Sequence, residues 1–387
     1  MLLSLTVYTG TALALAWLGW HVSSREKSSL RSGGGELPLW TWEIIAIALI
    51  YITVSSLRWL TSWDYKMYYG YYVSLQSIGD YSRENFEPLF ALVTYVLSHL
   101  GAHFSIYFAF WATTQICLLL YAMRHRKELL PWLALCIFLG PYYIFWMGFI
   151  RQSIVEAMFV LMVELIIRRK FWIYLLVTVV AMGIHRMCIL FIPLYFIPLI
   201  RVPERCSRWL PAALIVLCVV LGSFPQWLRL LFDHLGKFAD ILGYGHYYRL
   251  FMSNNLEYAF RNVIGPARLC PLLTCLMIVW YYPSMKTRYS QDSCFPAFFR
   301  FAVFYLCYIN LFANTTQYLT RPGELMRTVF LVMVCYTIHY LWRERKWLPF
   351  VAIALFCFYY VFYEMFKAHF TPGSIYVPAM YHTFLFG

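Results

Sequence analysis

Four arginines interrupt the apolar pattern of this sequence at positions where a charge is costly. They lie beside or inside long apolar runs and are Arg151, Arg186, Arg321 and Arg327. A guanidinium within a membrane helix costs at least about 2.5 kcal/mol on insertion scales, so such a group is a functional candidate by default. Arginine presents a planar, permanently charged fork to phosphate or carboxylate oxygens. These arginines therefore predict a binding site for a diphosphate or a carboxylate.

Further polar and aromatic residues accompany the arginines and could complete a reaction site. They are Gln152, His185, Arg249, Asp64, Glu87, Tyr65 and Tyr68. A histidine with a near-neutral pKa can accept a proton, and so can a carboxylate. His185 is therefore the first candidate for a general base, with Glu87 and Asp64 as the other two.

Each of these residues also has a purely structural interpretation. Arg151 can snorkel to the outer headgroups, and Gln152 can cap the start of a helix. His185 and Arg186 suit an interfacial position equally well. An acidic residue such as Asp64 or Glu87 is ordinary at a helix start. Only the combination of these residues on one side of the membrane indicates a site.

The composition indicates a polytopic helical membrane protein. The chain has 387 residues, of which 62% are hydrophobic and 13% charged, and its mean hydropathy is +0.63. Soluble domains carry about 25% charged residues. The net charge of +13 lies mainly in short loops between apolar runs, so a nucleic-acid partner is not predicted. We expect a single membrane domain over residues 1–387, with residues 1–20 as a first transmembrane helix rather than a cleaved signal.

Twelve apolar runs can span a membrane, which predicts an all-α bundle of about 12 transmembrane helices. The runs are 2–20, 40–59, 104–123, 129–147, 150–167, 171–184, 187–200, 209–223, 261–282, 299–318, 325–342 and 347–366. Basic clusters fix the orientation, because cytoplasmic loops are rich in Lys and Arg. With the N-terminus outside, the clusters at 25–31, 124–127, 168–170, 201–208, 286–288 and 343–346 all fall in the cytoplasm.

Two regions remain on the outer side. In the outer segment 60–103, the aromatic-rich stretch 64–75 suits an interfacial helix. The apolar stretch 87–100 is either a re-entrant or interfacial helix, or it pairs with a poorly apolar span near 65–80. Residues 224–260 form an outer loop. The eleven cysteines include no CxxC pair, so free thiols are expected and no metal site is predicted.

Residues 148–198 resemble the EpsG family of bacterial exopolysaccharide clusters. The motif "GFIRQ" and the later histidine match the family at Gly148, Arg151, Gln152 and His185, followed by Leu190, Phe191 and Pro193. The family's "DYxxY" and "EPxF" motifs match at Asp64, Tyr65, Tyr68, Glu87, Pro88 and Phe90. The chain departs from the pattern at Val155–Glu156 and at Met187–Cys188.

The resemblance implies a GT-C-like glycosyltransferase similar to Wzy-type polymerases. Such a protein joins oligosaccharide repeat units carried on undecaprenyl diphosphate, at the outer face of the bacterial inner membrane. The lipid-linked units are both donor and acceptor, and a flippase and a chain-length regulator are expected partners. The resemblance implies neither a metal nor another cofactor. A ligase for lipid-linked glycans and a flippase or transporter remain alternatives, and a transporter would need a polar path across the bilayer.

Overall fold

The structure, a computed structural model, is helical throughout the part of the chain that it describes. The described residues are 1–78, 86–200, 208–224, 227, 266–314, 317–370 and 380–386. Within them, extended pairing is limited to one isolated bridge between Arg58 and Thr383. The predicted all-α class is therefore confirmed for these ranges. Most of the predicted outer loop 224–260 lies outside the described residues.

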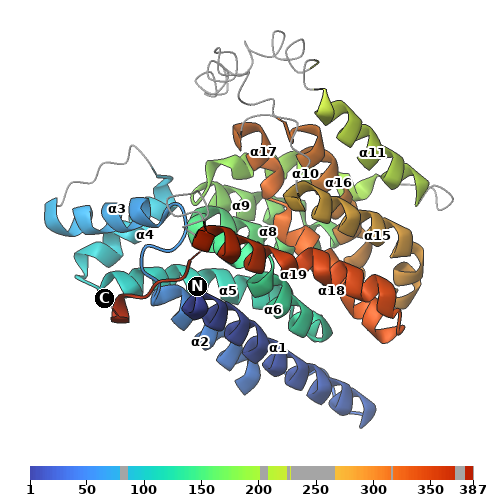
Figure 1. Cartoon of the computed structure of the whole chain (residues 1–387), viewed down its shortest axis with the longest axis horizontal. Coiled ribbons are helices and arrows are strands. Elements are labelled where there is room, and N and C mark those ends of the chain that lie inside the picture. Colours follow the sequence, from blue (N-terminus) through green and yellow to red (C-terminus); the bar gives the residue numbers. More distant parts are fainter. Residues whose placement is uncertain are drawn as a thin grey trace. The chain divides into compact units, whose positions relative to one another are not determined.

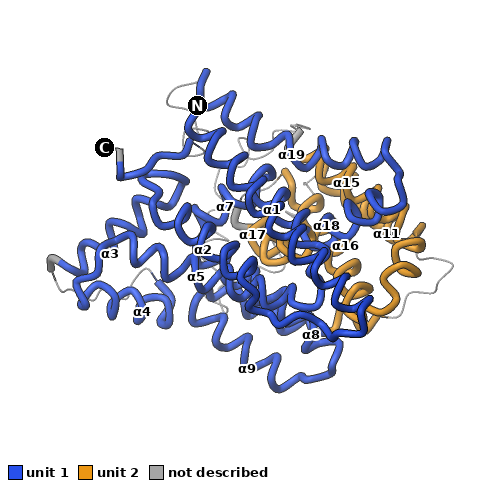
Figure 2. The backbone as a smooth tube through the Cα atoms, turned by 90° about the horizontal axis from the view of Figure 1, so that it is seen from below, with its two compact units in different colours: residues 1–195, 331–387 blue, residues 196–330 orange. Residues whose placement is uncertain are grey.

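The chain divides into two compact units (Figure 2). Unit 1 comprises residues 1–195 and 331–387, and unit 2 comprises residues 196–330. The prediction of a single domain over 1–387 stays a prediction. The helices that lie within unit 1 are α1 (Leu2–Arg31), α2 (Trp42–Ser56), α3 (Tyr65–Ile78), α4 (Pro88–His99), α5 (Phe104–Ala122), α6 (Leu130–Leu139), α7 (Tyr142–Gly148), α8 (Ile150–Ile167), α9 (Phe171–Met182), α10 (Phe191–Leu194) and α19 (Trp347–Phe370).

Unit 2 is built around helix α16 (Phe295–Leu311), which packs against α11 (Trp209–Ser223) and α15 (Pro266–Arg288). It also contains α17 (Gln317–Glu324) and the start of α18 (Arg327–Arg343), which continues into unit 1. The Arg300 guanidinium donates to the carbonyl of Pro198 at the start of the unit. Stacked rings of Tyr282 and Phe299, with centroids 3.6 Å apart, join α15 to α16.

Unit 1 is held together by close packing of its first helices. Helix α1 packs on α6, α2 packs on α5, and α5 packs on α8. Gly19 permits the closest approach, because a Cβ there would come within 2.9 Å of the Pro131 backbone nitrogen. Rings fill the interior: Tyr143 lies 4.2 Å from Phe138 and 5.7 Å from Tyr51, centroid to centroid. These tightly packed helices provide the rigid frame on which the polar residues lie.

Two predicted spans are interrupted by backbone features visible in the sequence. The run 129–147 bends by 65° between Lys127–Leu139 and Tyr142–Gly148. Gly140 and Pro141 lie at the bend, where a proline cannot donate the next helical hydrogen bond. The run 187–200 forms 3₁₀ turns at Arg186–Leu190 and Ile197–Leu199 around the short helix α10. Neither run is a straight transmembrane helix.

Helices α3 and α4 form a pair of short helices in the predicted outer segment (Figure 1). Helix α4 has 12 residues and therefore measures about 18 Å, short of a hydrocarbon core of about 30 Å. Its length fits the re-entrant or interfacial interpretation of 87–100. Tyr72 joins the pair, because its hydroxyl donates to the carbonyls of Leu97 at 3.1 Å and Ala102 at 2.8 Å.

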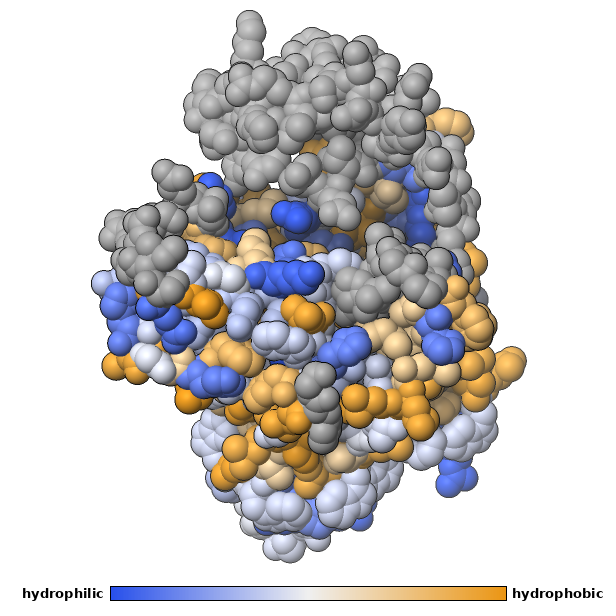
Figure 3. Space-filling view, turned by 60° about the vertical axis from the view of Figure 1, so that its left-hand side comes forward, coloured by the Kyte–Doolittle hydropathy of each residue, from blue (hydrophilic) through white to orange (hydrophobic). Residues whose placement is uncertain are grey.

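Three described helices are long and apolar enough to cross a membrane: α1, α5 and α19. The bent pair that contains α6 and α7 raises this number to four if it counts as one span. Other apolar helices, such as α2 and α11, have 15 residues each and are shorter than a full span. Large apolar side chains are exposed on many of these helices, and Figure 3 shows hydrophobic residues across one face. The chain is thus a helical membrane protein, while the number of about 12 spans is not confirmed.

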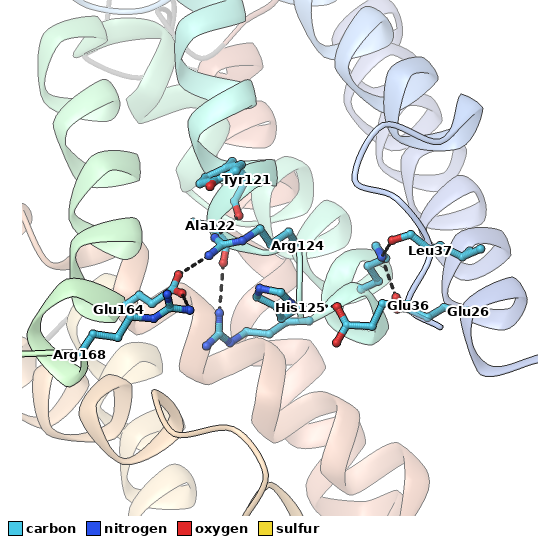
Figure 4. Close-up of polar contacts among 11 residues, drawn as sticks. Glu26, Glu36, Leu37, Tyr121, Ala122, Arg124, His125, Glu164 and Arg168 are labelled. Carbon is cyan, nitrogen blue, oxygen red and sulfur yellow. Dashed lines mark hydrogen bonds and ion pairs between the residues drawn. The ribbon is translucent and has the colours of Figure 1, made fainter. Parts of the chain in front are cut away.

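Turns that the sequence predicts on the cytoplasmic side of the membrane lie together in unit 1. The Lys127 ammonium donates to Glu26 Oε1 at 2.6 Å and to the Leu37 carbonyl at 2.7 Å. In the same region Arg124 lies 2.5 Å from Glu164, and Arg168 also contacts Glu164 (Figure 4). These contacts join the basic clusters 25–31, 124–127 and 168–170.

The two ends of the chain also lie close to each other, beside a turn that the sequence predicts on the outer side of the membrane. The Tyr381 N–H donates to Ser4 Oγ at 3.0 Å, and the Tyr381 hydroxyl donates to the Val54 carbonyl at 2.8 Å. The Trp59 N–H donates to the His382 carbonyl at 2.8 Å. The two ends of the chain are therefore neighbours.

Candidate functional site

Glu87 is placed by the first turn of α4. It is the N-cap residue, and Pro88 follows it at the first helical position, where no N–H is required. The next two N–H groups, of Leu89 and Phe90, donate to the Gly183 carbonyl at 2.8 and 3.1 Å. These bonds satisfy the free N–H groups of the helix start and tie α4 to the end of α9. The Glu87 side chain is 6% exposed.

Arg151, at the second position of α8, reaches this carboxylate. Its Nη1 donates to Glu87 Oε2 in a short ion pair. Its Nε lies 3.5 Å from the Tyr68 hydroxyl, and its guanidinium carbon lies 4.8 Å from the Phe86 ring and 5.8 Å from the Phe90 ring. The side chain is 20% exposed. Arg151 is thus oriented by a carboxylate, a phenol and two ring faces while part of it stays accessible.

Gly148 fixes the approach of this helix start to the outer segment. A Cβ at position 148 would strike the Ser62 hydroxyl, which donates to the Ile144 carbonyl at 2.9 Å. A residue without a side chain therefore allows the turn before α8 to lie directly against the segment before α3. Three residues later, Arg151 meets Tyr68 of α3.

Arg186 and His185 follow α9. Together with Glu87, Arg151 and Tyr68 they form the Arg151 cluster. The Arg186 N–H donates to Glu87 Oε1 at 3.1 Å, and its side-chain Nε lies 3.7 Å from the same oxygen. The Arg186 side chain is 67% exposed. His185 is half-buried, and its Nδ1 accepts the Met187 N–H at 3.3 Å. In the neutral ring the proton therefore lies on Nε2, which makes that atom a donor.

The electrostatics of the cluster keep Glu87 ionised. Burial by itself raises the pKa of this carboxyl, but the Arg151 guanidinium, the Arg186 N–H and the nearby His185 lower it more. The net result is a pKa below the ordinary value. One carboxylate thus faces two arginines, and the N-terminus of α8 adds positive partial charge. The site carries a surplus of positive charge suited to an anion.

Three further predicted residues make other contacts within unit 1. Gln152 faces the interior, where its Nε2 donates to Glu156 Oε1 at 3.0 Å. Tyr65 is buried against Phe108, with ring centroids 4.9 Å apart. Asp64 is half-buried one turn before Tyr68, whose N–H donates to the Asp64 carbonyl at 3.1 Å.

Two of the other predicted arginines lie in unit 2, and the third lies outside the described residues. Arg321 and Arg327 belong to unit 2. Arg321 is exposed on α17, and Arg327 forms an ion pair with Glu324. Arg249 lies outside the described residues. Within the described ranges, no group of three or more His, Cys, Asp or Glu side chains is arranged to hold a metal ion.

The sequence interpretation missed one buried arginine, Arg58, which follows α2. It is 3% exposed and lies at the outer end of the predicted span 40–59, two residues before the predicted outer segment. The same criterion that selected Arg151, an arginine beside an apolar run on the predicted outer side, also fits Arg58. The signal was present in the short stretch "SSLRWL".

Comparison with protein families gives one match that covers most of the chain. A family model described as the EpsG family matches residues 41–378, a range that includes the whole described cluster. Neither the curated proteins nor the solved structures provide a match.

Proposed function

Because the chain belongs to the EpsG family, we propose that it is a polysaccharide polymerase that joins lipid-linked oligosaccharide repeat units. Membership indicates a role in polysaccharide biosynthesis. The finer proposal is a glycosyltransferase of the bacterial inner membrane whose site faces the periplasm. Its donor and acceptor would be units carried on undecaprenyl diphosphate. The observation that carries the proposal is the paired Arg151 and Arg186 around a single carboxylate.

The chemistry of such a transfer requires stabilisation of a leaving diphosphate. The acceptor sugar oxygen attacks C1 of the donor sugar, and the bond between C1 and the phosphate oxygen breaks. The diphosphate takes the bonding electrons and gains negative charge. Preorganised donors at that position lower the barrier because they do not have to reorient during the reaction. Arg151 is held in this way by Glu87 and Tyr68, and the exposed Arg186 lies beside it.

The roles of the other polar residues follow from their contacts. Glu87 is ionised, accepts hydrogen bonds from Arg151 Nη1 and the Arg186 N–H, and lies 3.7 Å from Arg186 Nε, so we assign it to positioning the arginines. The Nε2–H of neutral His185 is a donor, and we assign it to a phosphate or sugar oxygen. The proton of the acceptor hydroxyl must pass to another group, and Asp64 is the remaining predicted carboxylate near Tyr68. We therefore assign the base to Asp64.

The central test replaces Arg151 by Ala in the producing strain. We expect polymer formation to fall about 100-fold or more, because removal of one preorganised donor has effects of this size. Polymer length and amount would be measured by gel electrophoresis of the extracted glycan. Single repeat units should accumulate on lipid at the outer face.

The matched control is Arg124→Ala, which removes an arginine that follows α5 and contacts Glu164 near the other end of α8. It should leave polymer length unchanged at equal protein level. Normal polymer from Arg151→Ala at normal expression would overturn the proposal. Accumulation of single units in the cytoplasmic leaflet would instead indicate a flippase, and normal polymer that stays on its lipid would indicate a ligase.

A further inference from the structure

Arg58 is a buried cation that the proposed reaction does not use. Its Nη1 donates to the Ser55 carbonyl at 2.8 Å, and its Nη2 donates to the Met147 carbonyl at 3.2 Å. Both carbonyls belong to last turns of helices, α2 and α7, where the backbone dipole favours a cation. The Phe108 ring lies 4.6 Å from the guanidinium carbon. Neutral groups thus surround a permanent charge.

These contacts leave both a charge and a donor unmatched. Among the residues that the structure describes, no carboxylate forms an ion pair with Arg58. Its Nε is buried and has no hydrogen-bond partner. A buried charge is normally paired, because removal from water is costly for an ion. An additional anion at this position would resolve both deficits.

A cavity lies beside this guanidinium within unit 1. It is about 10 Å³ in volume, and its walls include Arg58, Tyr51, Phe108, Gln115 and Trp146. The Gln115 Oε1 accepts the Tyr51 hydroxyl at 2.5 Å, while the Gln115 Nε2 is buried without a partner. The residues that line the cavity therefore carry three buried N–H donors without a partner, those of Arg58 Nε, Gln115 Nε2 and Trp111 Nε1. Its volume is enough for one water-sized species.

We propose that this cavity binds a single monatomic anion, chloride, between the Arg58 guanidinium and the Gln115 amide. The volume excludes phosphate, sulfate and carboxylates, including the lipid diphosphate. A water molecule would accept hydrogen bonds from Arg58 and Gln115 but would leave the charge unmatched. Chloride supplies both an acceptor and a negative charge. The proposal is independent of the glycosyl transfer, because none of its residues belongs to the Arg151 cluster.

The test measures thermal unfolding of the full chain in detergent at constant ionic strength. Sodium gluconate, whose anion is too large for the cavity, would be exchanged stepwise for sodium chloride and separately for sodium bromide. We expect a saturable rise in Tm of roughly 2 °C or more in either halide, as for a ligand that binds only the folded state. Bromide should also give an anomalous diffraction peak in the cavity of crystals grown with it.

Variants separate specific binding from a general effect of salt. Arg58→Met should abolish the halide-dependent rise, whereas the exposed Arg31→Met should retain it. If Arg58→Met does not fold, Gln115→Met decides the question, because it keeps the cation and should raise the halide concentration at half-effect several-fold. The same Tm in halide and gluconate for the wild type would overturn the proposal and indicate water. A halide effect of equal size in Arg58→Met, or in Gln115→Met, would overturn it as well.

Discussion

The two ends of helix α8 are each held by one carboxylate shared between two arginines. At the start, Arg151 and Arg186 share Glu87. Near the end, Arg124 and Arg168 share Glu164. The side-chain charges are the same in both groups, two positive and one negative. The helix makes the difference, because its N-terminus carries about +0.5 charge and its C-terminus about −0.5.

The backbone therefore increases the positive surplus at one end of α8 and reduces it at the other. The cluster at the start also buries its carboxylate more deeply, since Glu87 is 6% exposed and Glu164 is 18% exposed. An arginine at a helix start and a glutamate near a helix end both oppose the dipole, so neither is explained by helix stability. The comparison teaches that one side-chain pattern can form an anion site at the start of α8 and a purely structural ion-pair contact near its end.

Reversal of the charge of Arg186 should produce the largest difference in KM between the two ends of α8. In Arg186→Glu, two units of charge change beside the proposed diphosphate position, so we expect the KM for the lipid-linked donor to rise about tenfold or more. Arg168→Glu makes the same change at the other end, and it should leave KM within about twofold. The measurement is repeat-unit transfer by purified protein with extracted lipid-linked units. Equal effects of the two reversals would remove the distinction between the ends.

Neutralisation of the shared carboxylate should lower the free energy of unfolding more for Glu87, at the start of α8, than for Glu164, near its end. In Glu87→Gln, the largely buried Arg151 keeps only neutral partners, which costs about 2–3 kcal/mol. Glu164→Gln changes a more exposed ion-pair group, and its cost should stay within about 1 kcal/mol. Denaturant or thermal unfolding in detergent measures both free energies of unfolding. A larger loss in Glu164→Gln would show that the cluster at the start contributes little to the fold.

The smallest expected effect is a dependence of stability on acid pH. The folded-state pKa of Glu87 lies below its ordinary value of 4.5, so the folded chain binds this proton less readily than the unfolded chain. The stability that results is complete above about pH 4.5 and is lost as the pH falls through the folded-state pKa. Thermal unfolding from pH 6 to pH 3 should show this loss in the wild type and a smaller one in Glu87→Gln. An unchanged acid profile in the variant would mean that Arg151 does not perturb this carboxyl.

Much of the local structure of this chain was predictable from the sequence. The apolar runs anticipated the helices closely: 150–167 became α8 with the same bounds, and 104–123 became Phe104–Ala122. The interfacial stretch 64–75 became Tyr65–Ile78. Such agreement is expected because hydrophobic length and helix breakers are local properties. The bend at Gly140–Pro141 was visible in the sequence too, but the run was interpreted as one span.

The partnerships of the polar residues were not predictable in the same way. Arg151, Glu87 and Arg186 were each candidates, yet the sequence did not indicate that one carboxylate would hold both arginines. Gln152 follows Arg151 directly but faces Glu156, since adjacent helical residues point in different directions. Arg58 was passed over because its burial depends on α2, α5 and α7 together.

The sequence by itself determined that this is a helical membrane protein of the EpsG family with arginines beside its apolar runs. Composition, run length and motif order are carried by the chain without reference to its contacts. Only the tertiary structure decided which arginines are paired, which carboxylate is shared and which buried cation lies beside a cavity. The physical reason is that charge balance and burial are sums over neighbours. In this chain the decisive neighbours of Arg151 are 64 and 83 residues away.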